Sequence, residues 1–195
     1  KIALISMVTS LILGLLVALV RISKYKFLST LVSFYIDLFR GTPLLVQIII
    51  IFYALPDLGI RLDRYPAGIV ALTLNNGAYV AEIFRAGIES IAKGQTEAGR
   101  SLGLSYLQTM RKVILPQAFK RSLPPLTNSL IALLKDTSLV SVIGVQELLK
   151  QGRQLQTWLA NSTPLLGVAL MYFIIIYPLI KLVQQLERRL KKGMT

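Results

Sequence analysis

Charged side chains occur close together inside stretches of the sequence that are otherwise apolar. Three such places pair an acid with a base: Asp37 with Arg40, Glu82 with Arg85, and Lys135 with Asp136. An ionisable residue inside a membrane helix costs about 2.5–3.5 kcal/mol on insertion scales, which makes it a candidate for contact with a polar ligand. Neighbours three residues apart on a helix also neutralise one another without a ligand. Both interpretations stay open from the sequence alone.

Amide side chains occur in the same apolar stretches. At a rise of about 1.5 Å per residue, Asn75 and Asn76 lie about 14–15 Å beyond Pro66, and Asn128 lies about 11 Å beyond Arg121. We therefore expect a site for a polar solute near mid-membrane. Its candidate residues are Asn75, Tyr79, Glu82, Asn128, Lys135 and Asp136. The alternative role for the Asn side chains is hydrogen bonding between helices, which is common in membranes.

Several kinds of chemistry are excluded by residues that the sequence lacks. It contains no His and no Cys, so Cys/His zinc sites and His-dependent nucleophiles cannot form. It also contains no phosphate-binding loop of the form G-x-x-x-x-G-K-[ST] and no cluster of carboxylates suited to a metal. We expect a protein that is not an enzyme, holds no metal or cofactor, and does not itself hydrolyse ATP.

The composition is that of a membrane protein. Of the 195 residues, 54% are hydrophobic and 16% are charged, whereas soluble domains have about 45–50% and about 25%. The net charge of +13 is typical of basic cytoplasmic loops in such a chain. We favour that interpretation over nucleic-acid binding and over a soluble all-α protein.

Five apolar stretches are long enough to cross a bilayer as helices. They predict a single all-α, polytopic domain over residues 1–195, with spans at about 2–21, 28–56, 66–91, 118–144 and 163–187. Gly41-Thr42-Pro43 interrupts the second stretch. That stretch is therefore either one long tilted helix or a short helix leading into a span that starts near Gly41.

The distribution of basic residues predicts the orientation in the membrane. Segments 21–26, 93–121 and 188–192 contain 13 Lys and Arg, whereas segments 57–65 and 145–162 contain 4. Because Lys and Arg gather in cytoplasmic loops, we expect the N-terminus and the 145–162 loop to lie outside. The 93–116 loop and the C-terminus are then cytoplasmic.

The long basic loop predicts a short helix over 97–107, with Thr96 as its cap. Its apolar stripe consists of Ala98, Leu102 and Tyr106. Gly99 and Gly103 lie four residues apart and leave room for the backbone of another molecule. Such a helix fits a groove in a partner protein, and the alternative is a helix that lies flat on the membrane surface.

This loop resembles the motif of bacterial ABC importer permeases, which reads Glu-Ala-Ala, three residues, Gly, nine residues, Ile-x-Leu-Pro. The matching residues are Glu97, Ala98, Gly99, Gly103, Val113, Leu115 and Pro116, with Gly99 in place of Ala and Val113 in place of Ile. Segments 39–47, 78–87 and 135–139 are similar to the polar amino-acid branch, which includes the histidine, glutamine and arginine permeases.

The resemblance implies the permease subunit of an ATP-driven importer in the bacterial cytoplasmic membrane, working by alternating access. It implies ABC ATPase subunits that bind Mg-ATP, a second permease copy or homologue, and an extracytoplasmic binding protein that delivers the amino acid. The ATPase-coupling residues that it indicates are Glu97, Ala98, Gly99, Leu102, Gly103, Leu115 and Pro116. Polar amino acids are the expected solutes. Basic ones such as arginine are favoured. Glu82 or Asp136 can accept an ammonium or a guanidinium, but Glu82 fits the general family pattern and does not by itself indicate a basic solute.

Two other classes of function compete with this one. An ion-gradient-driven amino-acid transporter or a channel also uses acid–base pairs in its spans, but it leaves the loop helix without a purpose. A membrane enzyme is disfavoured by the absence of His, Cys and clustered carboxylates.

Overall fold

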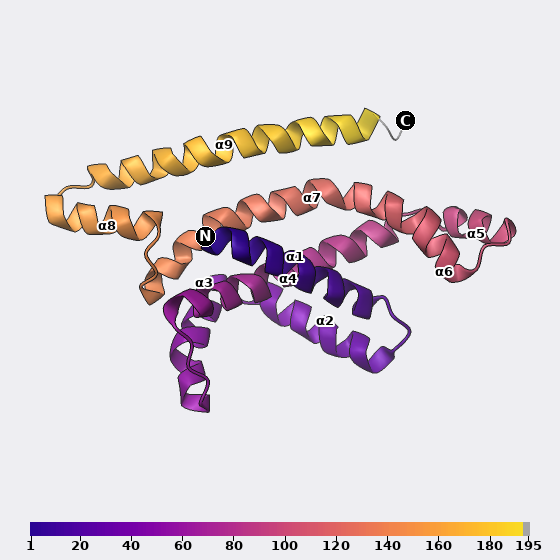
Figure 1. The fold of residues 1–195 in the computed structure, drawn as a ribbon, viewed down its shortest axis with the longest axis horizontal. Coiled ribbons are helices and arrows are strands. Elements are labelled where there is room, and N and C mark those ends of the chain that lie inside the picture. The colour runs from indigo at the N-terminus through magenta and orange to yellow at the C-terminus, as the bar shows by residue number, and fades with distance from the viewer. Residues whose placement is uncertain (193–195) are drawn as a thin grey trace.

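The computed structural model describes residues 1–192, and that part of the chain is built of helices with no strand (Figure 1). This confirms the all-α prediction. The α-helices are α1 (Ile2–Arg21), α2 (Lys26–Gly41), α3 (Leu44–Ile49), α4 (Arg64–Glu89), α5 (Lys93–Ser101), α6 (Tyr106–Thr109), α7 (Leu115–Asp136), α8 (Leu148–Leu159) and α9 (Thr163–Lys192). Short 3-10 or π-helical turns extend them at Ile50–Ala54, Leu55–Leu58, Met110–Ile114 and Thr137–Ile143.

The helices confirm a polytopic membrane protein. Four continuous segments are long and apolar enough to cross a membrane: Ile2–Arg21, Arg64–Glu89, Tyr106–Ile143 and Thr163–Arg189. A fifth candidate consists of two parts, Lys26–Gly41 and Leu44–Leu58. Each predicted span therefore corresponds to one helical segment or to this bent pair.

The second span is broken, which rules out one long tilted helix over 28–56. Its two parts are bent by 106° at Thr42 and Pro43, because the proline ring disfavours helical backbone geometry at the preceding residue, Thr42. The Gln47 amide donates to the Phe39 carbonyl at 2.9 Å and to the Thr42 carbonyl at 3.1 Å. The Asn75 amide also donates to the Phe39 carbonyl, at 3.1 Å. The Phe39 and Thr42 carbonyls beside the break are thus satisfied within the protein, as membrane burial favours.

Small residues let α1 pack closely against α4. The buried face of α1 repeats Ser6, Ser10 and Gly14 at intervals of four residues. A Cβ atom on Gly14 would lie 2.4 Å from Val80 Cγ1 and 2.9 Å from the Gly77 carbonyl oxygen. Membrane helices associate through such close backbone approach, since lipid is as apolar as the partner helix. This contact fixes the position of α4, which carries three of the six candidate solute-binding residues: Asn75, Tyr79 and Glu82.

The fourth helical segment begins at Tyr106, well before the predicted start of the span near 118. It contains a π-helical turn over Met110–Ile114, immediately before Pro116 near the start of α7. Proline has no N–H to donate, and a local widening of the helix accommodates the missing bond. Pro124 and Pro125 lie inside α7 without ending it.

The two longest connections lie at opposite ends of the molecule. Figure 1 shows α5 and α6 at one end of the molecule and α8 at the other end. This arrangement separates the 93–116 segment from the 145–162 segment by the length of the membrane-spanning helices.

Candidate functional site

A groove of about 730 Å³ lies between the break in the second span, α4 and α7. We call it the central groove. Its lining residues are Arg40, Gly41, Thr42, Pro43, Leu44, Asn75, Asn76, Tyr79, Ile83, Pro125, Asn128, Ser129, Ala132 and Asp136. Its size falls within the range of about 300–1,000 Å³ that small-molecule sites occupy. The break contributes backbone groups to the lining as well as side chains.

Four of the six predicted solute-binding residues line this groove: Asn75, Tyr79, Asn128 and Asp136. Tyr79 is 40% exposed, and Asn128 is also exposed. The Asn128 side chain makes no hydrogen bond among the residues that the structure describes. The Asn128 amide, which offers both donors and an acceptor, is therefore not used in bonds among the described residues.

The two neighbouring Asn residues of α4 are buried and bonded to other helices. Asn75 donates to Gln47 Oε1 at 3.0 Å in addition to the Phe39 carbonyl. Asn76 donates to Ser10 Oγ at 2.8 Å and accepts a bond from Ser129 Oγ at 2.7 Å. Asn76 thus joins α1, α4 and α7, which is the helix-bonding role that the sequence left open.

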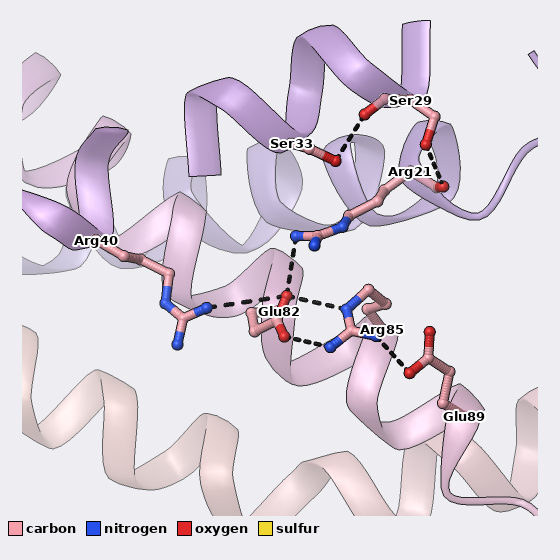
Figure 2. A network of polar contacts seen from close by, with 7 residues as sticks. All are labelled: Arg21, Ser29, Ser33, Arg40, Glu82, Arg85 and Glu89. Atoms are coloured by element: carbon pink, nitrogen blue, oxygen red, sulfur yellow. Dashed lines mark hydrogen bonds and ion pairs between the residues drawn. The ribbon is translucent and has the colours of Figure 1, made fainter. Parts of the chain in front are cut away.

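Glu82 does not line the groove but is surrounded by three Arg side chains (Figure 2). Arg21 Nη1 lies 3.0 Å from Glu82 Oε2, and Arg40 Nη1 lies 3.9 Å from the same oxygen. Arg85 contacts both carboxylate oxygens and also pairs with Glu89. These contacts confirm the predicted Glu82–Arg85 pair and add the ends of α1 and α2 to it. The five side chains carry a net charge of +1.

The other two predicted acid–base pairs form no ion pair within residues 1–192. Asp37 is exposed, while its expected partner Arg40 turns toward Glu82. Lys135 lines a separate cavity of about 340 Å³ between α7 and α9, together with Tyr172 and Tyr177. The structure therefore separates Lys135 from the groove that its neighbour Asp136 lines.

The predicted loop helix over 97–107 is wrong in its extent, because two signals divide it. Gly103 adopts φ +79°, and the N–H groups of Gly103 and Leu104 donate to the Arg100 and Gly99 carbonyls at 2.9 and 3.2 Å. These bonds form a glycine-terminated helix end, so α5 stops at Ser101. α5 also begins at Lys93 rather than at a Thr96 cap.

A capping box then restarts the helix. Ser105 Oγ accepts a bond from the Gln108 N–H, and Gln108 Oε1 accepts one from the Ser105 N–H. The helix that follows runs through Leu115 and Pro116, which are therefore part of the fourth span and do not end the loop. The connection between α5 and α6 consists of residues 102–105 alone.

The two glycines of the loop have different surroundings. A Cβ on Gly99 would lie 2.6 Å from Thr109 Cγ2, so this glycine permits packing within the chain and is not free for a partner. Gly103 has no atom within 4 Å of its Cβ position. Around it, Leu102 is 82% exposed and Leu107 is 74% exposed. Glu97 and Ala98 are exposed on α5 as well.

Sequence reasoning missed four polar residues of the groove lining: Arg40, Thr42, Asn76 and Ser129. Arg40 was expected to pair with Asp37, three residues earlier. The signal that would have identified it is Pro43, because a helix broken there ends with Arg40 in its last turn.

The sequence matches the family of binding-protein-dependent transport system inner membrane components over residues 10–192. A relative from Bacillus subtilis (strain 168), the L-cystine transport system permease protein TcyB, is 44% identical over 96% of this chain and 81% of its own length. The arginine transport system permease protein ArtQ of the same organism is 40% identical over 99% and 89%. The glutamine transport system permease protein GlnP of Escherichia coli (strain K12) is 41% identical over 97% and 88%.

Solved structures agree with this match. A crystal structure of an amino acid ABC transporter with histidines contains a chain that superposes with a TM-score of 0.93 at 40% identity, over 97% of this chain and 89% of that one. The methionine ABC transporter MetNI, in an inward-facing conformation, has the same fold, with a TM-score of 0.79 at 24% identity over 97% and 91%.

Proposed function

Because this chain belongs to the family of binding-protein-dependent transport system inner membrane components and is the permease subunit of an amino-acid ABC importer, we propose that the central groove is its solute path. Polar amino acids cross the membrane there by alternating access. ATP hydrolysis resides in separate subunits of such systems. The observation that supports this proposal best is the meeting of Asn75, Tyr79, Asn128 and Asp136 in one groove beside a broken helix. Broken helices line midplane solute sites in other transporters.

The finer choice of solute rests on the chemistry of the groove. Relatives carry cystine, arginine and glutamine in their names, and all three compounds have an ammonium and a carboxylate. Basic amino acids such as arginine are our favoured solutes, with Asp136 as the acceptor for a guanidinium. Glu82 is not assigned this role here, because Arg21 and Arg85 already occupy its oxygens.

We assign docking of the ATPase to the turn between α5 and α6. Leu102, Tyr106 and Leu107 are 82%, 56% and 74% exposed there, and exposed apolar side chains at the tip of a projecting turn suit a partner groove. The family implies ATPase subunits that bind Mg-ATP and a second permease copy or homologue. An extracytoplasmic binding protein that delivers the solute completes the proposed assembly.

Reconstitution tests this function. Vesicles that hold the complete complex should take up a labelled amino acid only when ATP is present inside and the binding protein is present outside. A proton or sodium gradient should not replace ATP. Uptake driven by a gradient through the permease alone would contradict the proposal and favour a secondary transporter or channel.

Within that assay, Asn128→Leu should reduce uptake by about 10–100-fold, since a lost hydrogen bond to a charged solute group costs about 1.5–3 kcal/mol. The complex should still assemble, because Asn128 bonds to no other helix among the described residues. The matched control is Asn76→Leu, which removes the bonds to Ser10 and Ser129 and should reduce assembly instead. Full uptake by Asn128→Leu would remove this residue from the solute path.

We propose that the α5–α6 end is cytoplasmic and α8 external, from the 13-to-4 asymmetry of basic residues. The chain has no Cys, so single Cys residues can be labelled without background. In intact cells, an impermeant thiol reagent should label Gln154→Cys on exposed α8 and leave Ser101→Cys unlabelled. The reverse pattern would invert the topology.

A further inference from the structure

We propose that Arg40 binds the carboxylate of the transported amino acid. To do so, the Arg40 side chain moves away from Glu82. This inference rests on the proposed function, because it assigns a role in the same groove. It adds a solute-binding residue and identifies the solute group that every accepted substrate must share, namely a free carboxylate.

The first observation is that Glu82 has more cationic partners than it needs. Glu82 Oε2 accepts bonds from Arg21 Nη1 and Arg85 Nε, both at 3.0 Å, and Glu82 Oε1 accepts one from Arg85 Nη2. Arg40 lies beyond hydrogen-bond distance, at 3.9 Å. The carboxylate therefore keeps its hydrogen bonds when Arg40 moves away.

The second observation is where Arg40 lies. Figure 2 shows Arg40 and Arg85 approaching Glu82 from opposite sides. The Arg40 side chain is 40% exposed, against 22% for Arg21 and 24% for Arg85. Of these three, Arg40 alone lines the central groove. Its guanidinium carbon lies 5.4 Å from the centre of the Tyr79 ring, which provides a flat apolar support on the groove wall.

The third observation is the charge balance of the groove. Its lining contains one cationic side chain, Arg40, and one anionic side chain, Asp136. This pair complements an amino acid, whose ammonium and carboxylate also carry one charge of each sign. A guanidinium matches a carboxylate in shape and can donate two parallel hydrogen bonds to it. The geometry thus makes Arg40 the partner of the solute's anionic end.

The test measures direct binding to the permease–ATPase complex in nanodiscs without the binding protein, so that only the groove selects. Each probe is an amino acid paired with its decarboxylated analogue: glutamine with 4-aminobutanamide, arginine with agmatine, and cystine with cystamine. The wild-type complex should bind its amino acid about 10–100-fold more tightly than the matching amine, the expected effect of charge-assisted hydrogen bonds to one carboxylate.

Arg40→Gln should remove this preference. Its affinity for the amino acid should decrease about 10–100-fold, while its affinity for the amine stays within about threefold of wild type. Arg40→Lys keeps the charge without the bidentate geometry and should give an intermediate preference, which tests the proposal even if Arg40→Gln does not fold. The matched control is Arg21→Gln, which removes another guanidinium from Glu82 but not from the groove lining, and it should keep the full preference.

Three results would overturn the inference: full preference in Arg40→Gln, full preference in Arg40→Lys where Arg40→Gln does not fold, or equal loss of preference in Arg21→Gln. A wild-type complex that binds no amino acid in nanodiscs would also overturn it. In that last case, ATP-driven uptake by the complete complex would still uphold the proposed function, so the two failures are distinguishable.

Discussion

Replacing Gly14 with Leu is expected to prevent the chain from folding stably in a membrane. The new side chain would enter a space where Val80 Cγ1 and the Gly77 carbonyl oxygen already lie 2.4 and 2.9 Å from the Cβ position. Val80 could turn only into other buried side chains, and a backbone carbonyl cannot move without moving α4. Overpacking costs about 1–3 kcal/mol where neighbours can adjust and more where they cannot, so we expect a loss of at least about 3 kcal/mol. The measurement is the thermal midpoint of the purified protein, together with its monodisperse fraction in gel filtration.

The matched control is the same substitution at Gly167 in α9. Its Cβ position has no atom within 4 Å, and an extra apolar side chain on an exposed face of a membrane helix is tolerated. Gly167→Leu should therefore keep the wild-type thermal midpoint. Equal midpoints for the two variants would show that α1 and α4 do not pack as closely as described.

Gly103→Asp is expected to uncouple ATP hydrolysis from amino-acid uptake while the spans insert normally. Gly103 lies at the exposed turn that we assign to ATPase docking, beside Leu102 at 82% exposure. A carboxylate brought into that contact would be buried without a partner, at a cost of about 3–5 kcal/mol. Docking should then weaken by more than about 100-fold. Co-purification of the ATPase subunit and solute-stimulated hydrolysis in vesicles measure the two effects.

Charge must be separated from backbone strain at this position, because Gly103 has φ +79°. Asn is similar to Asp in shape and also tolerates the left-handed conformation, so Gly103→Asn is the control and should dock far better than Gly103→Asp. Normal docking and stimulation in Gly103→Asp would exclude this turn from the contact. Equal defects in both variants would indicate strain and not buried charge as the cause.

The spans were predictable from the sequence because length and apolarity alone decide whether a helix can cross a bilayer. The course of the second span was not, since Pro43 is compatible with either a kink or a complete break. The outcome depends on Gln47 and Asn75, whose amides donate to the carbonyls around the break. Such distant partners cannot be identified from local sequence.

The loop helix shows a different limit. A glycine within a helical pattern is either an interior residue or a helix end, and the ABC permease motif fixes its spacing without fixing its conformation. Ser105 and Gln108 stand at the spacing of a capping box, so the second helical start was visible in the sequence. The second start was not predicted, because the apolar spacing of Leu102 and Tyr106 favoured one continuous helix.

The candidate site was predicted in part for a comparable reason. The sequence identified Asn75, Tyr79, Asn128 and Asp136 as polar residues within apolar helices, and these four residues meet in the groove. It could not identify Arg40, because the direction of the last turn of α2 depends on the break that follows. Nor could it show that Glu82 is held by Arg21, which lies 61 residues away in the chain.

The bend between α2 and α3 also bears on how the protein is made. The Phe39 carbonyl accepts a bond from Asn75, 36 residues later in the chain. During synthesis, the second span therefore leaves the ribosome before one of the groups that completes its turn has been translated. Exposed non-helical backbone is unfavourable in lipid. We therefore expect the bent second span to stay inside the insertion machinery, shielded from lipid, until α4 has been synthesised. The second span and α4 are then expected to enter the bilayer together as one unit.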